Sequence, residues 1–89
     1  MITARVTIVN QLGLHARASA KLTKLAGSFP CEVWITRGER RINGKSIMGV
    51  MMLAAGLGSE VEIETDGARE QEAMQALQAL IADKFGEGQ

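Results

Sequence analysis

The chain of 89 residues contains one cysteine, one histidine and one proline, and tyrosine is absent. Because Cys31 has no second cysteine to pair with, an intrachain disulfide is excluded, which agrees with a reducing cytoplasm. One histidine and one cysteine are too few for a protein-built zinc site, so we expect neither a metal nor a cofactor. Ten basic and ten acidic residues give a formal net charge of zero, which excludes a general attraction to nucleic acids or anionic membranes.

Long apolar runs are also missing. No stretch approaches the roughly 20 apolar residues that cross a membrane, and the N-terminus enters a strand pattern without the basic and apolar regions of a signal peptide. The length suits one domain over residues 1–89, and it is too short for a nucleotide-binding domain together with a substrate domain. We therefore expect a cytoplasmic, monomeric protein that inserts into no membrane and binds no nucleic acid.

Strand and helix patterns follow one another in the order β-α-β-β-α-β-α. Alternation of apolar and polar residues predicts strands at 2–8, 31–36, 40–43 and 60–66. Apolar residues at helical spacing predict helices at 16–26, at 47–55 and from 70 to 85, and a frayed tail at 87–89. Strands with one apolar face, covered by helices, predict an α+β fold: a two-layer sandwich with a largely antiparallel sheet.

His15 lies directly before the first predicted helix and outside its apolar stripe. A helix start presents unpaired N–H groups and the positive end of the macrodipole, so it favours a neutral imidazole and attracts an anion. Arg17 adds a permanent cation whose forked donors suit phosphate. The arrangement indicates a nucleophilic imidazole that accepts a phosphoryl group, which Arg17 and the first helical turn would then hold. The alternative is a polar helix cap without a chemical role.

The tripeptide Gly44-Lys45-Ser46 is similar to part of a nucleotide-binding loop. A P-loop needs four residues between its two glycines, whereas five residues separate Gly38 from Gly44, and they have a strand pattern. A small nucleotide-hydrolysing enzyme is therefore disfavoured. Ser46 has two compatible interpretations: it caps the helix that follows, or it is a phosphorylation site that places about two negative charges there.

The short helix predicted at 47–55 is apolar almost all round, although two turns can bury only one face. We expect part of its large side chains to remain exposed; the candidates are Ile47, Met48, Met51 and Met52. Flexible methionine side chains on a surface suit docking to several unrelated partners, whereas methionines in a core fill gaps. Their crowding into one short segment favours docking.

Two motifs in this chain closely resemble one known family. The run Gly13-Leu14-His15-Ala16-Arg17 is followed later by Gly44-Lys45-Ser46-Ile47-Met48-Gly49-Val50-Met51. Together they resemble the histidine-containing phosphocarrier protein (HPr) family of the bacterial phosphotransferase system, and the likeness covers essentially the whole chain. The resemblance implies an open-faced sandwich in which three helices cover one side of a four-stranded antiparallel sheet of order 1-4-2-3.

The same resemblance implies a phosphoryl carrier rather than an enzyme. His15 would be phosphorylated on Nδ1 by phosphorylated enzyme I, which draws on phosphoenolpyruvate, and would pass the group to a histidine of an enzyme IIA domain. Arg17 matches the family's active-site arginine, and Ser46 matches the serine that HPr kinase/phosphorylase modifies. The positions at which the family docks its partners are Ala16, Ala20, Lys24, Ile47, Met48 and Met51.

Ala18 departs from the family, because many members have proline at this position. Proline is tolerated in the first helical turn, whereas alanine leaves an additional N–H group there. The difference bears on helix rigidity and on the lifetime of phosphohistidine rather than on the role. Two alternatives stay open: a carrier in a nitrogen-related regulatory phosphorelay, and a regulatory binding module that acts through Ser46 while His15 is vestigial.

Overall fold

The computed structural model describes residues 1–87. Its regular elements follow the predicted order, and their bounds are β1 (Ile2–Thr7), α1 (Ala16–Gly27), β2 (Glu32–Arg37), β3 (Arg40–Asn43), α2 (Ile47–Met52), β4 (Glu60–Asp66), α3 (Glu70–Ala82) and a terminal 3-10 turn, η1 (Lys84–Gly86). No helix within the described residues is both long enough and apolar enough to span a membrane.

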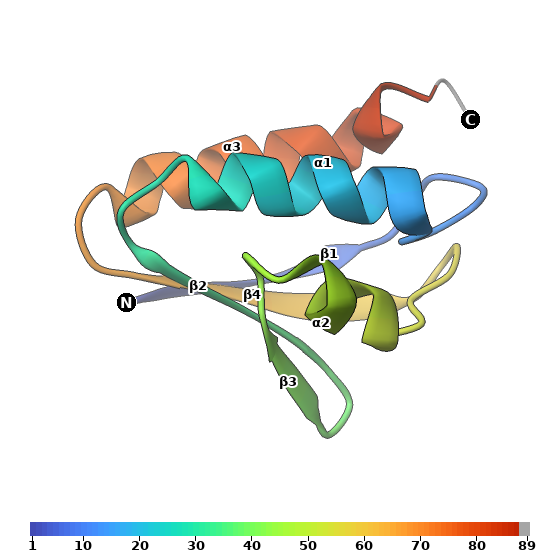
Figure 1. Cartoon of the computed structure of the whole chain (residues 1–89), viewed down its shortest axis with the longest axis horizontal. Helices are drawn as coiled ribbons and strands as arrows, with labels where there is room; N and C mark the ends of the chain where they lie inside the picture. The colour runs from blue at the N-terminus through green and yellow to red at the C-terminus, as the bar shows by residue number, and fades with distance from the viewer. Residues whose placement is uncertain (88–89) are drawn as a thin grey trace.

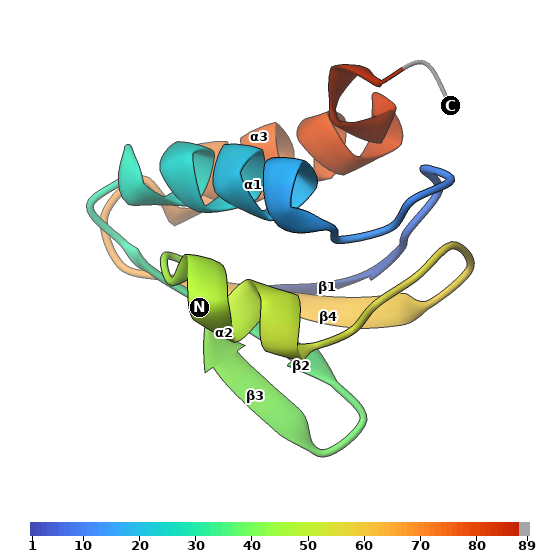
Figure 2. The ribbon, with the colours of Figure 1, turned by 45° about the vertical axis from the view of Figure 1, so that its right-hand side comes forward.

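The four strands form one sheet in the order β1-β4-β2-β3, and all three pairings are antiparallel. The helices lie on one face of this sheet, and α1 packs against both α3 and α2 (Figures 1 and 2). The α+β sandwich and the strand order 1-4-2-3 are therefore confirmed. This arrangement leaves the opposite face of the sheet open to solvent.

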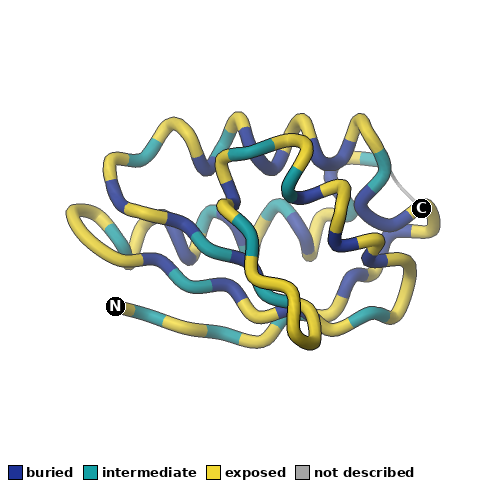
Figure 3. Tube along the Cα trace, turned by 60° about the horizontal axis from the view of Figure 1, so that its bottom comes forward, coloured by how far each residue is buried: buried dark blue, intermediate teal, exposed yellow. Residues whose placement is uncertain are grey.

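Burial follows the alternation that the sequence predicts (Figure 3). In β4, Val61 and Ile63 are buried beneath the helices, whereas Glu60 and Glu62 are exposed on the other face. The helices contribute a matching stripe, formed in α1 by Ala18, Leu22 and Ala26 and in α3 by Ala73, Met74, Leu77 and Ile81. Full burial of one large apolar side chain contributes about 1.5–3 kcal/mol, so this layer is the main source of stability.

Two helices end earlier than their apolar patterns predict. The short helix α2 ends at Met52 rather than at residue 55, and Ala54 has a left-handed backbone with φ of 52°. The last helix ends at Ala82, because Lys84 and Phe85 have φ values of 55° and 54° that no α-helix can contain. Phe85 is still completely buried, but it reaches the core through η1.

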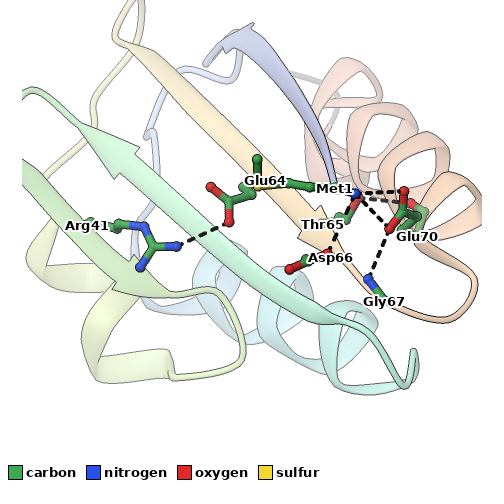
Figure 4. A network of polar contacts seen from close by, with 7 residues as sticks. All are labelled: Met1, Arg41, Glu64, Thr65, Asp66, Gly67 and Glu70. Carbon is green, nitrogen blue, oxygen red and sulfur yellow. Dashed lines mark hydrogen bonds and ion pairs between the residues drawn. The ribbon is translucent and has the colours of Figure 1, made fainter.

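Polar contacts connect the N-terminus to the turn between β4 and α3 (Figure 4). The ammonium group of Met1 lies 3.1 Å from both carboxylate oxygens of Glu70 and 3.6 Å from Asp66. Glu70 also accepts the N–H of Gly67 at 3.0 Å, and its carbonyl oxygen accepts the Thr65 hydroxyl at 2.9 Å. The start of α3 is thereby held against the ends of β1 and β4.

Trp34 lies on the open face of the sheet, where it is half-buried. The guanidinium of Arg41 stacks over its ring at 4.2 Å and pairs with Glu64 at 3.2 Å. Trp34 therefore packs against charged side chains of the sheet rather than against the helices.

Candidate functional site

His15 is the N-cap of α1. Its φ and ψ of −72° and 179° are those of extended backbone, and its carbonyl oxygen accepts the N–H of Ser19 at 2.8 Å. The imidazole Nδ1 accepts the backbone N–H of Arg17 at 3.3 Å, which is the role that a serine or aspartate side chain usually has at this position. The side chain is 28% exposed. The ring is thus a helix cap that solvent, or a partner, can still reach.

The loop before His15 is held in place by a close backbone contact. Gly13 has φ of +65°, and a Cβ atom there would lie 2.5 Å from the carbonyl oxygen of Ala55 and 2.6 Å from Cα of Gly56. The N–H of Leu14 donates to the same Ala55 oxygen at 2.9 Å, and the Leu14 side chain is buried. Only glycine suits this position, and the contact fixes the direction in which the chain enters α1.

Two side chains secure the loop from inside. The amide of Asn10 donates to the carbonyl oxygen of Gly13 at 2.8 Å, and the hydroxyl of Ser19 donates to the carbonyl oxygen of Leu14 at 3.0 Å. Both Asn10 and Ser19 are completely buried. The backbone on which His15 stands is therefore tied to α1 and to the core.

Arg17 lies in the first turn of α1, and its side chain is exposed. It lines an open hollow of about 730 Å³ together with His15, and the other lining residues are Gln11, Leu12, Ala16, Gly86 and Glu87. Among residues 1–87, no carboxylate lies within ion-pair distance of the Arg17 guanidinium. The sequence places Arg17 beside His15, and the structure gives the two residues a common surface.

Glu87 also belongs to this site, which the sequence did not reveal. Its Oε2 contacts Nε2 of His15, and its Oε1 accepts the amide of Asn10 at 3.0 Å. The hydrogen bond from Asn10 lowers the pKa of the Glu87 carboxyl, and the His15 contact and the charge of Lys21 lower it further. Partial burial acts in the opposite direction, but the net shift of the pKa is downward. Glu87 is therefore ionised at neutral pH.

The expectation that the tail frays from residue 87 onward is wrong for Glu87, whose side chain is only 14% exposed. The reason is the fold-back at η1, which directs Glu87 toward the start of α1 rather than into solvent. The expectation for positions 88 and 89 lies outside the described residues. No motif in the sequence marks Glu87 as a partner of His15, because the two residues are brought together by the fold and not by their spacing.

Ser46 caps α2 as the sequence predicts. Its hydroxyl oxygen accepts the N–H of Gly49 at 3.1 Å, and its own N–H donates to the carbonyl oxygen of Asn43 at 3.0 Å. Ser46 is half-buried and does not line the hollow that contains His15. The structure therefore places the two candidate modification sites at separate points of the surface.

The residues expected to dock partners are all exposed. On α1 they are one turn apart along a single stripe: Ala16, Ala20 and Lys24. On α2 the exposed fractions are 46% for Ile47, 73% for Met48 and 42% for Met51. Because α1 packs against α2, the two groups lie on neighbouring helices. The sequence did not single out Leu12, which is 69% exposed and lines the hollow beside His15.

Comparisons of the sequence and of the structure with known proteins agree with one another. A family model described as the PTS HPr component phosphorylation site matches residues 2–83. A phosphocarrier protein HPr from Cupriavidus necator is 64% identical over 89 residues, which is the full length of both chains. A crystal structure of HPr from Thermoanaerobacter tengcongensis superposes with a TM-score of 0.95 at 39% identity over 98% of each chain. A crystal structure from the same organism described as an HPr dimer gives a TM-score of 0.79 at 39% identity, over 98% of this chain and 100% of that one.

Proposed function

Because this chain belongs to the HPr phosphocarrier family of the phosphotransferase system, we propose that it carries a phosphoryl group on Nδ1 of His15 between two protein partners. Its homologues are phosphocarrier proteins, so its role is that of a carrier rather than a catalyst. The observation that supports the proposal is the direction of the ring. Nδ1 faces the start of α1, where it accepts the Arg17 N–H at 3.3 Å.

The chemistry follows from this direction. The electron pair of Nδ1 forms the bond to phosphorus while the bond between phosphorus and the donor breaks. The oxygens of the transferred group then meet the free N–H groups and the positive dipole end of α1. The exposed guanidinium of Arg17, in the same hollow, supplies a second source of positive charge. Exposure of the ring lets a donor and an acceptor reach it in turn.

The proposed donor is enzyme I, and the proposed acceptors are enzyme IIA domains. The transfer would take place in the cytoplasm, and the whole chain would act as a single carrier domain. We call the six residues Ala16, Ala20, Lys24, Ile47, Met48 and Met51 the docking surface. Its methionines are adaptable apolar contacts, and Lys24, with Arg17 nearby on the same helix, favours acidic partners. A nitrogen-related relay would use the same chemistry with other partners.

Ser46 is proposed as a regulatory site for an HPr kinase/phosphorylase. A phosphate on its hydroxyl would be compatible with α2, because a helix start favours negative charge. It would also place about two negative charges next to Ile47 and Met48 of the docking surface. Such charge opposes the docking of an acidic partner, so modification of Ser46 would slow transfer without changing His15.

The test is incubation with labelled phosphoenolpyruvate and enzyme I, followed by acid treatment. Phosphohistidine is acid-labile and phosphoserine is acid-stable. The matched variant is His15→Asn, because asparagine also caps helices well but cannot accept a phosphoryl group in this way. We expect acid-labile label on the parent chain and none on the folded variant. Full labelling of His15→Asn, or acid-stable label on the parent, would contradict the proposal.

A further inference from the structure

The C-terminal segment, residues 84–87, folds back over the start of α1. The turn η1 packs beside α1, and the end of the described chain lies next to the loop that leads to His15 (Figures 1 and 2). Three successive residues, Lys84, Phe85 and Gly86, have left-handed backbones with φ of 55°, 54° and 75°. Two of them are not glycine, so this route costs free energy that a frayed tail would avoid.

Specific contacts offset that cost. The side chain of Phe85 is completely buried, and its carbonyl oxygen accepts Nζ of Lys21 at 2.7 Å. Glu87 is held in turn by Asn10, whose amide N–H groups donate both to Glu87 at 3.0 Å and to the carbonyl oxygen of Gly13 at 2.8 Å. The carboxylate is thus connected to the same loop that carries His15.

The two ring nitrogens of His15 consequently have partners of opposite kinds. Nδ1 faces a donor, the backbone N–H of Arg17. Nε2 faces an acceptor, the carboxylate of Glu87. A neutral imidazole carries one proton, and only the tautomer with the proton on Nε2 satisfies both contacts. The nitrogen without a proton is then Nδ1, and its electron pair becomes available to phosphorus when the Arg17 N–H releases it.

We propose that Glu87 is a positioning residue for the phosphoryl transfer: its carboxylate holds the Nε2 proton of His15 and thereby makes Nδ1 the nitrogen that reacts. The inference rests on the proposed function, which places the phosphoryl group on Nδ1 of His15, and adds the contact that keeps the proton of the neutral ring on Nε2. Orientation of a reacting imidazole by a carboxylate on its other nitrogen is a general device of catalytic and metal-binding histidines.

The transfer from the donor to His15 needs no reactant besides these two. The Nδ1 electron pair bonds to phosphorus, the donor's bond to phosphorus breaks, and the donor keeps that electron pair. Nε2 keeps its proton, so the ring gains one positive charge, which develops beside the Glu87 carboxylate. On transfer to the acceptor the charge disappears again, and the contact returns to its starting state.

The experiment compares the parent chain with Glu87→Ala, using phosphoramidate as a small-molecule donor that imposes no docking geometry. In this reaction the phosphorus–nitrogen bond of phosphoramidate breaks and ammonia leaves. Asp83→Asn is the control, because it also removes one negative charge from the same end of the chain and Asp83 is exposed. Nuclear magnetic resonance with ¹⁵N-labelled histidine identifies which ring nitrogen carries phosphorus and whether Nε2 carries a slowly exchanging proton.

We expect the parent and Asp83→Asn to be phosphorylated on Nδ1 and to retain the slowly exchanging Nε2 proton. In Glu87→Ala this proton should exchange freely, and the ratio of Nε2-linked to Nδ1-linked product should rise roughly tenfold or more, because a hydrogen bond to a charged group is lost. An unchanged ratio together with an unchanged Nε2 proton, in a folded variant, would overturn the inference.

The measurements distinguish a wrong role for Glu87 from a wrong carrier function. If enzyme I labels the parent on Nδ1 but Glu87→Ala behaves identically in both measurements, the carrier function stands and the role of Glu87 is wrong. If enzyme I does not label the parent, the carrier function is wrong, and the Nε2 proton of the unphosphorylated chain still decides whether Glu87 orients the ring.

Discussion

Gly13→Ala tests the contact that positions the loop before His15. Two costs add up at this position. Alanine in a left-handed conformation costs roughly 1–2 kcal/mol, and the new Cβ would lie 2.5 Å from the Ala55 oxygen and 2.6 Å from Cα of Gly56. Backbone atoms cannot turn away as a flexible side chain can, so we add about 1–3 kcal/mol for overpacking. The expected loss is about 2–5 kcal/mol, a large share of the roughly 5–15 kcal/mol that stabilises a typical domain.

Gly38→Ala is the matched control. Gly38 has nearly the same backbone conformation, with φ of +60°, but apart from Gly38 and its two chain neighbours no residue has a heavy atom within 4 Å of the position of its Cβ. The control should therefore lose only the conformational part, about 1–2 kcal/mol. The difference between the two variants isolates the contact of Gly13 with Ala55 and Gly56.

Urea unfolding of the parent chain, Gly13→Ala and Gly38→Ala measures these losses of stability. The dependence of the unfolding free energy on urea concentration should be the same in all three, so that their midpoints can be compared directly. In thermal unfolding, 1 kcal/mol corresponds to about 4–8 °C for a domain of this size, so the variants should be well separated. Equal losses for Gly13→Ala and Gly38→Ala would refute the reasoning. Equal losses would mean that the loop before His15 can move away from Ala55 without a cost in free energy. The contact of Gly13 with Ala55 would then not hold His15 in place.

Three further predictions concern other parts of the molecule. Ser46→Ala removes the cap of α2 and should lower the free energy of unfolding by about 0.5–2 kcal/mol, whereas Ser46→Asp should keep most of it; chemical denaturation measures both. The Gly67 N–H, followed by the N-terminal ammonium, lowers the pKa of Glu70 below its usual value of 4.5. This contribution to stability is present above pH 4.5 and is lost as the pH falls through the lower folded-state value, so Glu70→Gln should show a smaller loss of thermal stability on acidification. Met48→Asp, at a side chain that is 73% exposed, should leave the unfolding midpoint nearly unchanged but slow labelling by enzyme I; an unaltered labelling rate would exclude Met48 from the docking surface.

Periodicity predicted the elements but not how they pair. The alternation of Val61 and Ile63 with glutamates indicates a strand with one buried face, and this is enough to assign the core. It does not say which strand lies beside β4, because pairing depends on contacts between distant segments. The order 1-4-2-3 came from the resemblance to a family, and the structure confirms it.

The site was predictable only where its residues are close in sequence. His15, Arg17 and the cap at Ser46 depend on local helix starts, whose chemistry is visible in the chain. Glu87 was missed because its contact with His15 spans 72 positions and depends on a chain reversal at Lys84 and Phe85, which have positive φ although neither is glycine. Backbone propensity disfavours such conformations, and the contacts that offset their cost, such as the burial of Phe85 and its hydrogen bond from Lys21, become visible only in the folded chain.

The central claim is that His15 accepts the phosphoryl group on Nδ1. The most direct measurement correlates phosphorus with the ring nitrogens by magnetic resonance after incubation with phosphoenolpyruvate and enzyme I. We predict a single phosphorus signal coupled to Nδ1 of His15. Phosphorus bonded to Nε2, or found only on a residue other than His15, would contradict the account.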